Sequence, residues 1–437
     1  MKRLYGAGRR GAGLLGAFLG LLTAAAGPVA AQGVWPQFRG PNRDGISPDR
    51  GLLKEWPPEG PRLLWSATGL GVGYSSVAVV GNRIYTMGDV ADGDGRVQCI
   101  IALDAATRAK VWTAKVGPPH SDGPRCTPTV DGDRVYAIGT SGDLVCVSAA
   151  DGKEVWRKHL ERDFGGKMMS SWAYSESPLV DGERLVCTPG GPEAAMVALN
   201  KRTGALLWKC ATPPLGGRGR DGAGYSSIVV SNGAGVRQYV QLTGRGVFGA
   251  RATDGKFLWG YNRVANGTAN ISNPLVQGDL VFCSTGYNTG SALLKLSPTG
   301  DGGVKAEEVY FLPATEFQNH HGGMVLLNGY VYGGHGHNQG APTCIELATG
   351  RVMWKGDQLG TGSAAVCAAD GLLIFRYQAD QVFLLEATPA ACRVKGMFRQ
   401  QRFPGARGMA WAHPVVVGGK LYLRHADVLL CYDLKNP

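Results

Sequence analysis

Short apolar segments alternate with polar turns along most of this chain. In Thr129–Tyr136, for example, Asp131-Gly132-Asp133 separates two apolar halves. An apolar strand, a turn rich in Gly, Asn and Asp, and a second apolar strand form the pattern of a β-hairpin. Similar hairpins occur in the segments 79–85, 179–185, 325–332 and 416–422. Because no segment keeps a helical period, we predict an all-β protein.

An aliphatic residue followed by an aromatic residue recurs near the end of each repeat. The aromatic members are Trp65, Trp112, Trp156, Trp208, Trp259, Tyr310, Trp354 and Phe398. Consecutive members lie 44 to 52 residues apart, and several follow a turn such as Asp151-Gly152 or Thr203-Gly204. These dipeptides supply the positive φ angle that a tight turn needs. A repeat of this length, made of short strands, predicts the four-stranded blades of a β-propeller.

The number of repeats predicts how the ring closes. Seven repeats run from Trp65 to Phe398, and the C-terminal segment supplies the inner strands of an eighth. The outer strand of that blade is missing at the C-terminus, whereas an apolar strand stands at 62–65. We predict that this strand pairs with the segment 429–434, which closes eight antiparallel blades over residues 62–437 and removes open sheet edges. The Pro-containing segment 32–61 is predicted to be an irregular N-terminal arm.

The first 31 residues have the features of an export signal. A basic start is followed by an apolar stretch at 11–23, and small residues precede Gln32. We predict cleavage after Ala31 and a location in the periplasm or outside the cell. An uncleaved signal-anchor helix is the alternative. No later stretch is long and apolar enough for a membrane span, so none is expected in the mature chain.

Composition and charge restrict the class of protein further. The chain has 437 residues, including 67 Gly, and is 44% hydrophobic and 18% charged. This is too apolar for a disordered chain, and the Gly residues lack the period of collagen. The net charge of +11 falls to about +7 without Lys2, Arg3, Arg9 and Arg10. Because the remaining basic residues form no cluster, we expect no nucleic-acid partner.

The repeats resemble a known family. The segments from Ala102-Leu103-Asp104 to Trp112 and from Ala198-Leu199-Asn200 to Trp208 are similar to the pyrroloquinoline-quinone (PQQ) repeat. The resemblance covers roughly residues 62–434. This family contains quinone-dependent alcohol dehydrogenases and also non-enzymatic members, such as the propeller lipoprotein of the outer-membrane barrel-assembly machinery. The resemblance implies that the repeated aromatics dock neighbouring blades.

The same resemblance bears on catalysis. The dehydrogenases of the family stack PQQ between a Trp and a disulfide of adjacent cysteines, and hold Ca²⁺ with a Glu, an Asn and a catalytic Asp. This chain has no adjacent Cys pair, and Glu176 is the only candidate acid at the start of an innermost strand. We therefore expect no catalytic residue, no cofactor and no metal. A periplasmic PQQ-dependent alcohol or sugar dehydrogenase, with PQQ and calcium, is the alternative.

The ten cysteines indicate packing more than chemistry. Cys146 and Cys344 stand ten residues before a repeated aromatic, where other repeats have Ala102, Ala198 or Gly249, and Cys431 occupies the matching place in the last strand. A position that alternates between Cys, Ala and Gly is a small and crowded one. We predict buried thiols, although an exported chain could oxidise a pair that the sequence does not identify.

Four of the eight histidines fall in one predicted blade: His320, His321, His335 and His337. The strand pattern places the two pairs on opposite rims, or one pair on a rim and the other in a connection. Imidazole suits zinc and copper, but Glu316 is the only carboxylate nearby. We therefore favour histidines that line the channel or form hydrogen bonds, with a metal site as the alternative.

Polar residues precede the innermost strand of every repeat, and in a propeller these positions converge on the central channel. The candidate ligand-binding residues are Tyr74, Arg125, Trp172, Glu176, Tyr225, Asn270, His320 and His413. Arg125 could bind an anionic group, Glu176 a cation, and the aromatic residues a planar body. The alternative is that these residues only solvate a pore, and that partners dock on outer loops at 213–220 or 286–291. We expect an exported binding or scaffold module whose partner is a protein or a small ligand.

Overall fold

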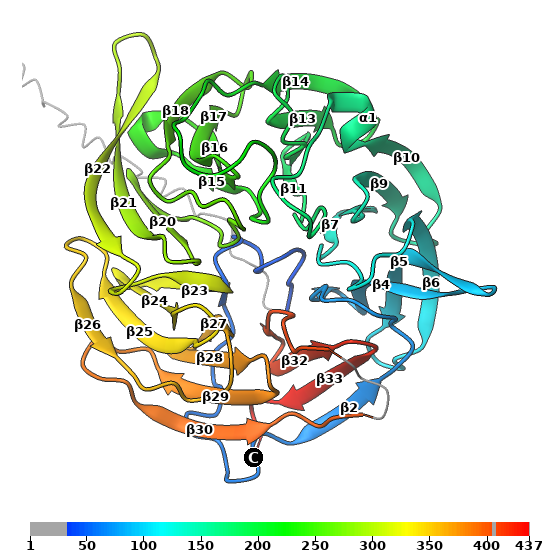
Figure 1. Cartoon of the computed structure of the whole chain (residues 1–437). Helices are drawn as coiled ribbons and strands as arrows, with labels where there is room; N and C mark the ends of the chain where they lie inside the picture. Colours follow the sequence, from blue (N-terminus) through cyan, green and yellow to red (C-terminus); the bar gives the residue numbers. More distant parts are fainter. Residues whose placement is uncertain (1–32, 404–407, 437) are drawn as a thin grey trace, which may run out of the picture. The chain divides into compact units, whose positions relative to one another are not determined.

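Eight β-sheets surround a central axis in the computed structural model, which describes residues 33–403 and 408–436 (Figure 1). Seven sheets have four strands and one has five. The prediction of an eight-bladed β-propeller is therefore confirmed. The described helices are only α1 (Leu160–Phe164) and the short 3-10 helix η1 (Gly233–Gly235).

The strands of each blade follow one another from the channel to the outer edge. The first four blades contain β3 (Ala78–Val80), β4 (Arg83–Asp92), β5 (Gly95–Asp104) and β6 (Lys110–Gly117); β7 (Thr129–Asp131), β8 (Arg134–Ile138), β9 (Asp143–Ser148) and β10 (Glu154–His159); β11 (Leu179–Asp181), β12 (Arg184–Cys187), β13 (Met196–Asn200) and β14 (Leu206–Cys210); and β15 (Val229–Ser231), β16 (Gln238–Thr243), β17 (Gly246–Arg251) and β18 (Phe257–Tyr261). The next three contain β19 (Leu275–Gln277), β20 (Leu280–Thr285), β21 (Gly290–Pro298) and β22 (Val304–Pro313); β23 (Asn319–Leu327), β24 (Tyr330–His335), β25 (Ala341–Glu346) and β26 (Val352–Lys355); and β27 (Ala364–Ala369), β28 (Leu372–Tyr377), β29 (Gln381–Glu386) and β30 (Val394–Arg399), with β1 (Ile46–Ser47) added beside β27.

The eighth blade closes the ring with strands from both ends of the described chain. It contains β31 (Val415–Val417), β32 (Lys420–His425), β33 (Val428–Asp433) and β2 (Leu63–Ala67), and Trp65 pairs with Cys431 across the junction. The predicted closure is therefore confirmed. Arg424, which is buried on β32, adds hydrogen bonds to the carbonyls of Leu70 and Gly71 at 3.0 and 3.2 Å.

The repeated aromatics lie on the outer strands and contact the following blade. The indole nitrogens of Trp112 and Trp208 donate to the carbonyls of Ala149 and Ala252 at 3.1 and 3.2 Å. Trp156, Trp354 and the Tyr310 hydroxyl make equivalent bonds to Lys201, Thr388 and Leu347. Trp259 instead bonds Gln238 of its own blade, while Trp65 and Phe398 pack against Tyr422 and Tyr432. The contacts of Trp112, Trp156, Trp208, Tyr310, Trp354 and Phe398 join each of these blades to the next, whereas those named for Trp259 and Trp65 lie within one blade.

In three blades the small residue ten positions before the aromatic, Ala102, Cys146 or Cys344, lies between two aromatic residues of the neighbouring strands. In the second blade Cys146 pairs with Trp156 on one side and with Tyr136 on the other, and these two rings are 6.1 Å apart. Ala102 has the same position between Tyr85 and Trp112. A larger side chain would have to displace a ring, which explains the restriction to small residues. All ten cysteines are free thiols, and nine of them are buried.

The N-terminal arm crosses the centre of the ring and contacts the inner strands of several blades (blue in Figure 1). Trp35 exchanges backbone hydrogen bonds with Val79, and β1 pairs in parallel with β27. Arg43 is buried and donates to the carbonyls of Ser177 and Pro178 at 2.7 and 3.1 Å. Apart from the two-residue strand β1, the described part of the arm has no regular strand or helix, and these contacts tie it to the propeller.

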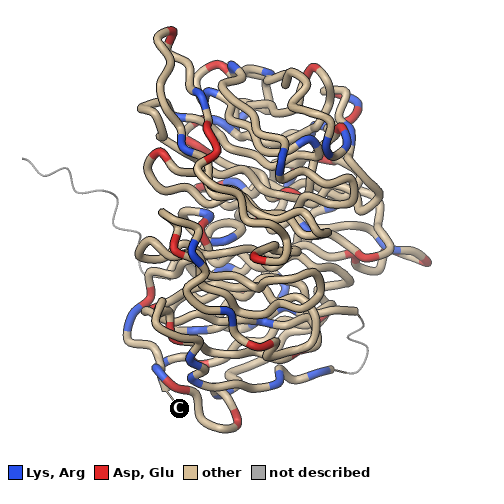
Figure 2. The backbone as a smooth tube through the Cα atoms, turned by 60° about the vertical axis from the view of Figure 1, so that its left-hand side comes forward, with Lys and Arg blue, Asp and Glu red and all other residues tan. Residues whose placement is uncertain are grey.

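Lys and Arg residues are interspersed with Asp and Glu residues along the backbone (Figure 2). Among the described residues, no helix has the length and apolar character needed to cross a membrane. The predicted signal segment, residues 1–31, lies outside the described residues.

Candidate functional site

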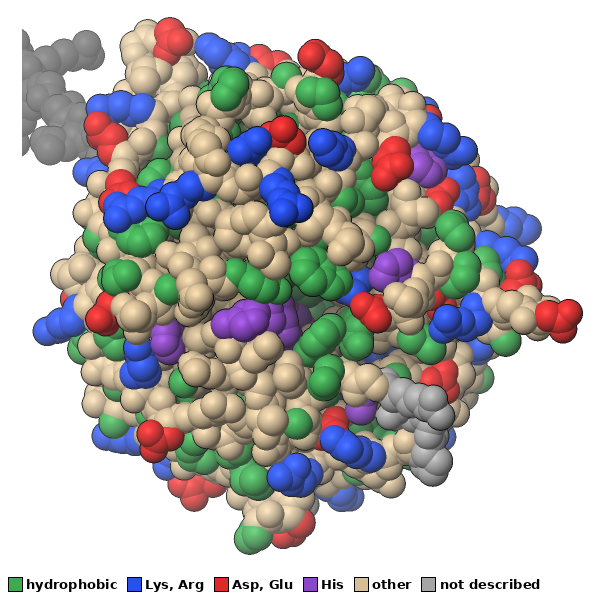
Figure 3. Space-filling view, viewed as in Figure 1, with side chains coloured by type: hydrophobic (Ala, Val, Ile, Leu, Met, Phe, Trp, Pro, Cys, Tyr) green, Lys and Arg blue, Asp and Glu red, His purple; other side chains and the backbone are tan. Residues whose placement is uncertain are grey.

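A cavity of about 310 Å³ opens at the end of the channel where the innermost strands begin. Side chains from several blades and from the N-terminal arm line it, because each blade directs the segment before its first strand toward the axis. Of the predicted ligand-binding residues, the structure brings together Tyr74, Arg125, Trp172, Tyr225, His320 and His413. Histidine and apolar side chains surround the opening at the centre of one face (Figure 3).

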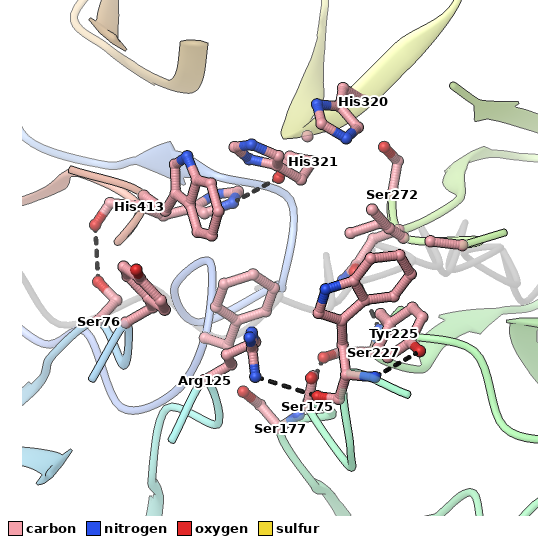
Figure 4. A pocket seen from close by; sticks show the side chains of 18 of the residues that line it. Ser76, Arg125, Ser175, Ser177, Tyr225, Ser227, Ser272, His320, His321 and His413 are labelled. Atoms are coloured by element: carbon pink, nitrogen blue, oxygen red, sulfur yellow. Dashed lines mark hydrogen bonds between the residues drawn. The ribbon is translucent and has the colours of Figure 1, made fainter. Parts of the chain in front are cut away.

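Aromatic side chains form the walls of the cavity (Figure 4). The rings of Tyr74 and Trp411 are 4.8 Å apart, and those of Trp172 and Tyr225 are 5.9 Å apart. The hydroxyl of Tyr225 accepts a hydrogen bond from the backbone nitrogen of Trp172 at 3.3 Å, which fixes this pair. Two aromatic walls of this kind favour a planar ligand.

A third wall consists of imidazoles from the sixth blade. His320 lies 4.2 Å from His337 and 4.5 Å from His321 between ring centroids. Burial lowers the pKa of His320 to about 2 and that of His321 to about 3, so both rings are neutral near pH 7. The nitrogens of His320 bond the hydroxyls of Ser363 at 2.8 Å and Tyr287 at 3.1 Å. Neutral rings held in this way act as hydrogen-bonding groups.

The structure decides between the two placements expected for the four histidines. β24 runs back toward the start of β23, so the turn that holds His337 reaches the same end of the channel as His320. The prediction that the two histidine pairs lie on opposite rims is therefore wrong. The alternative, with one pair on a rim and the other in a connection, is confirmed. His335 is absent from the lining; its Nδ1 accepts a bond from the backbone nitrogen of Gln318. Over residues 33–403 and 408–436, no three His, Cys, Asp or Glu side chains are arranged to hold a metal ion.

Two arginines supply the positive charge of the lining. Arg125 donates to the carbonyl of Trp172 at 3.0 Å and to Asp122 at 2.9 Å, and its guanidinium lies 5.7 Å from the centre of the Tyr74 ring. Arg39, from the arm, is buried. Burial lowers the pKa of Arg39 to about 10, so it still carries its charge at neutral pH. The lining therefore contains two guanidinium groups, of which that of Arg125 is paired with Asp122.

Glu176 and Asn270 do not line the cavity, which corrects the expectation for these two residues. The carboxylate of Glu176 is buried and accepts hydrogen bonds from Thr188 and Gln241. Burial raises its pKa to about 8. Asn270 is fully buried and donates to the carbonyls of Thr243 and Gly244. Both side chains point into the protein because the polar segments that start the strands also join blade to blade.

A series of hydrogen bonds joins neighbouring blades where their innermost strands begin. The backbone nitrogen of Ser76 donates to the Thr127 hydroxyl at 3.2 Å, and that of Thr127 donates to the Ser177 hydroxyl at 2.9 Å. The series continues from Ser177 to Ser227 and from Ser227 to Asn273, each at 3.0 Å. The hydroxyl-rich segments therefore fix the spacing of five successive blades at the cavity.

Several lining residues were not among the predicted set: Phe38, Arg39, Tyr287, His321, His337 and Trp411. His321, His337 and Trp411 belong to motifs that the sequence makes visible. Phe38 and Arg39 carry no such signal, since nothing local indicates that the arm returns to the channel. The ring of Phe38 lies 5.0 Å from that of His413, which places the arm directly beside the channel residues.

The fold and cavity define an eight-bladed propeller of the PQQ-repeat class. The family model described as outer membrane protein assembly factor BamB matches residues 93–356, and the chain belongs to this family. No curated protein matches it.

Two solved dehydrogenase structures share the architecture, and a third structure was also found. A europium-containing methanol dehydrogenase is 13% identical with a TM-score of 0.65, over 90% of this chain and 89% of that one. The quinohemoprotein alcohol dehydrogenase of Comamonas testosteroni is 12% identical with a TM-score of 0.63, over 92% and 81%. BamB from Moraxella catarrhalis is 15% identical with a TM-score of 0.43, over 85% and 99%. At these identities the two dehydrogenases show the fold alone.

The cavity residues do not fit a calcium-bound quinone. Calcium takes oxygen ligands, with carboxylates prominent among them. No Asp or Glu belongs to the lining formed by the described residues, and Glu176 is engaged by Thr188 and Gln241 away from it. The chain also lacks the adjacent cysteines on which the dehydrogenases of the family stack PQQ.

Proposed function

We propose that the protein is an exported binding module of the cell envelope, with no catalytic activity of its own, which holds a ligand in its central cavity. The observation that carries this proposal is the chemistry of the lining. Aromatic rings, hydroxyls, imidazoles and two arginines surround the space, and none of the described lining residues is a carboxylate. Such a set can orient a ligand but supplies no acidic side chain for calcium or for proton abstraction.

The imidazoles do not replace the missing carboxylate. A general base works best when its pKa lies near the working pH. The pKa values of His320 and His321, about 2 and 3, make both rings poor proton acceptors. This argues for binding over dehydrogenation, although the same fold serves dehydrogenases.

Family membership supports the same reading. The family is described as an outer membrane protein assembly factor. By analogy with that description, we propose that the partner is a protein or a small ligand. We also propose that the protein is located in the periplasm or outside the cell.

A variant that fills the cavity tests the proposal. Ile271→Trp adds a large ring to the lining. Val309→Trp adds the same ring on the outer strand β22, where Val309 is 48% exposed, and serves as the matched control. The chain from Gln32 onward, and each variant, is incubated with an extract of its own cell envelope and examined by native mass spectrometry.

We expect the parent and Val309→Trp to retain a component that Ile271→Trp loses. Equal retention by all three proteins would contradict the cavity as the binding site. A second assay supplies PQQ, Ca²⁺, an alcohol and a redox dye. Alcohol-dependent reduction of the dye would contradict the absence of catalysis.

A further inference from the structure

We propose that residues 35–49 of the N-terminal arm are a peptide ligand of the propeller, which the innermost strands hold without need of the covalent link to them. The segment carries a tryptophan and two arginines at four-residue spacing, Trp35, Arg39 and Arg43, and it crosses the centre of the ring (blue in Figure 1). This peptide site is distinct from the site of the cavity ligand and does not depend on the proposed function.

Open strand edges form one part of the peptide site. The innermost strand of each blade has only one neighbour within its blade, so its other edge faces the channel. Trp35 exchanges two backbone hydrogen bonds with Val79 on the edge of β3, at 2.8 and 2.7 Å. The carbonyl of Pro36 accepts a bond from Val130 on the edge of β7 at 2.8 Å, and β1 pairs in parallel with β27. Proteins often bind extended peptides by adding them to open strand edges in this way.

Two buried arginines anchor the segment to blades that are not neighbours in the ring. Arg39 donates to the carbonyl of Met324 on β23 in the sixth blade. Arg43 donates to the carbonyls of Ser177 and Pro178, directly before the first strand of the third blade, at 2.7 and 3.1 Å. Hydrogen bonds from a charged donor are stronger than those between neutral groups. The two guanidinium groups therefore fix the segment across the channel.

A pocket for the tryptophan and a bond to the last carboxylate complete the site. Trp35 is 1% exposed and belongs to an apolar cluster of the first and eighth blades that includes Val415. Its ring covers Gly40 of the arm, where a Cβ would lie 2.9 Å away. The carboxylate of Asp49 accepts a bond from the backbone nitrogen of Gly419 in the eighth blade at 2.6 Å. The segment thus contacts the first, second, third, sixth, seventh and eighth blades.

The bound segment also forms the inner end of the cavity. Phe38 and Arg39, near its middle, are lining residues. The pairing with Val79 and Val130 lies further along the innermost strands, whereas the cavity opens where these strands begin. The cavity therefore has its observed depth only while the segment is bound.

The covalent link between the arm and β2 passes through an exposed turn, in which Gly60 donates a backbone bond to Pro57 at 2.8 Å. Pro58 and Glu59 are exposed, so a protease recognition sequence can be inserted between them in the chain from Gln32 onward. Cutting there removes the link and none of the contacts described above. We expect native mass spectrometry to show the arm and the propeller as one complex at micromolar concentration. Loss of the arm, or unfolding on cutting, would overturn the proposal.

Competition between peptides tests the anchoring by arginine. Isotope-labelled peptides of residues 32–58 are added in excess to the cut protein, and the peptide that replaces the arm is identified by its mass. We expect the Arg43→Gln peptide to bind about tenfold or more weakly than the parent peptide, because it lacks the bonds to Ser177 and Pro178. The control peptide, Arg50→Gln, should bind like the parent. Arg50 is exposed, and its side chain bonds only carbonyls of the arm itself.

Equal uptake of the Arg43→Gln and parent peptides would overturn the proposal. If the bound arm does not exchange, the same two substitutions are made in the chain before cutting, and the urea concentration that releases the arm is measured. We expect release from Arg43→Gln at a lower urea concentration than from the parent and from Arg50→Gln. Release of all three arms at one urea concentration would also overturn the proposal.

Discussion

The indole ring of Trp156 covers Gly204 of the following blade, while its Nε1 donates a hydrogen bond to the carbonyl of Lys201 at 3.0 Å. Gly204 has a φ angle of +70°, and a Cβ there would lie 2.8 Å from the indole ring. Glycine is therefore required at this turn for two reasons: the backbone has a positive φ angle, and the indole ring leaves no space for a Cβ atom. Trp112 covers Gly152 in the same way.

Replacing either member of this contact should destabilise the propeller. Trp156→Ala removes a large buried side chain, and we expect a loss of about 3–5 kcal/mol in the free energy of unfolding. Gly204→Ala strains the backbone and also clashes with the ring. Gly182→Ala is the control, because Gly182 has a similar φ angle of +60° with no atom near the added Cβ. Urea unfolding should show a clearly larger loss for Gly204→Ala than for Gly182→Ala; equal losses would contradict the packing role.

The crowded position between two rings gives a second prediction. Cys146→Ala should change the free energy of unfolding by about 1 kcal/mol or less, whereas Cys146→Leu should cost about 1–3 kcal/mol by overpacking. The contact of Tyr136 and Trp156 leaves no room for the added methyl groups. Chemical denaturation measures both variants. A tolerated Leu would show that this position is not confined.

Ring closure gives a third prediction. Deleting residues 429–437 removes most of β33 and exposes the edges of β2 and β32. Exposed edges and apolar side chains should lower both the melting temperature and the soluble yield sharply. The matched control deletes only residues 435–437, which leaves β33 intact. If the longer deletion melts like the parent, the terminal pairing does not hold the ring together.

Acid should destabilise the folded chain through its buried histidines. Burial lowers the pKa of His335 to about 4, below the ordinary value of 6.5. The unfolded state therefore binds more protons than the folded state between these two values. The resulting stabilisation is complete above pH 6.5 and is lost as the pH falls toward 4, by up to about 2 kcal/mol at pH 5.

His335→Asn should flatten this part of the curve of unfolding free energy against pH. His159→Asn is the control, since His159 caps α1 and Asn is also a good N-cap. An unchanged slope in His335→Asn would refute the contribution assigned to His335.

The repeated features of the fold could be predicted from the sequence, whereas contacts that occur only once could not. Eight blades, their hairpins and the closing strand follow from the apolar pattern and from aromatics such as Trp112 and Trp208. The contact of Phe38 with His413 joins residues 375 positions apart and leaves no periodic trace. The direction of the polar side chains at the start of the inner strands could not be predicted either. A polar residue at the start of an inner strand can face the cavity, as Tyr225 does, or the neighbouring blade, as Glu176 does.

The central claim is that the cavity lined by Arg125, Trp172 and Trp411 holds a ligand. Native mass spectrometry of the chain from Gln32 onward, incubated with its cell-envelope extract beside Ile271→Trp, tests it most directly. We predict a bound component in the parent protein that Ile271→Trp loses. Equal retention of that component by both proteins would contradict the claim.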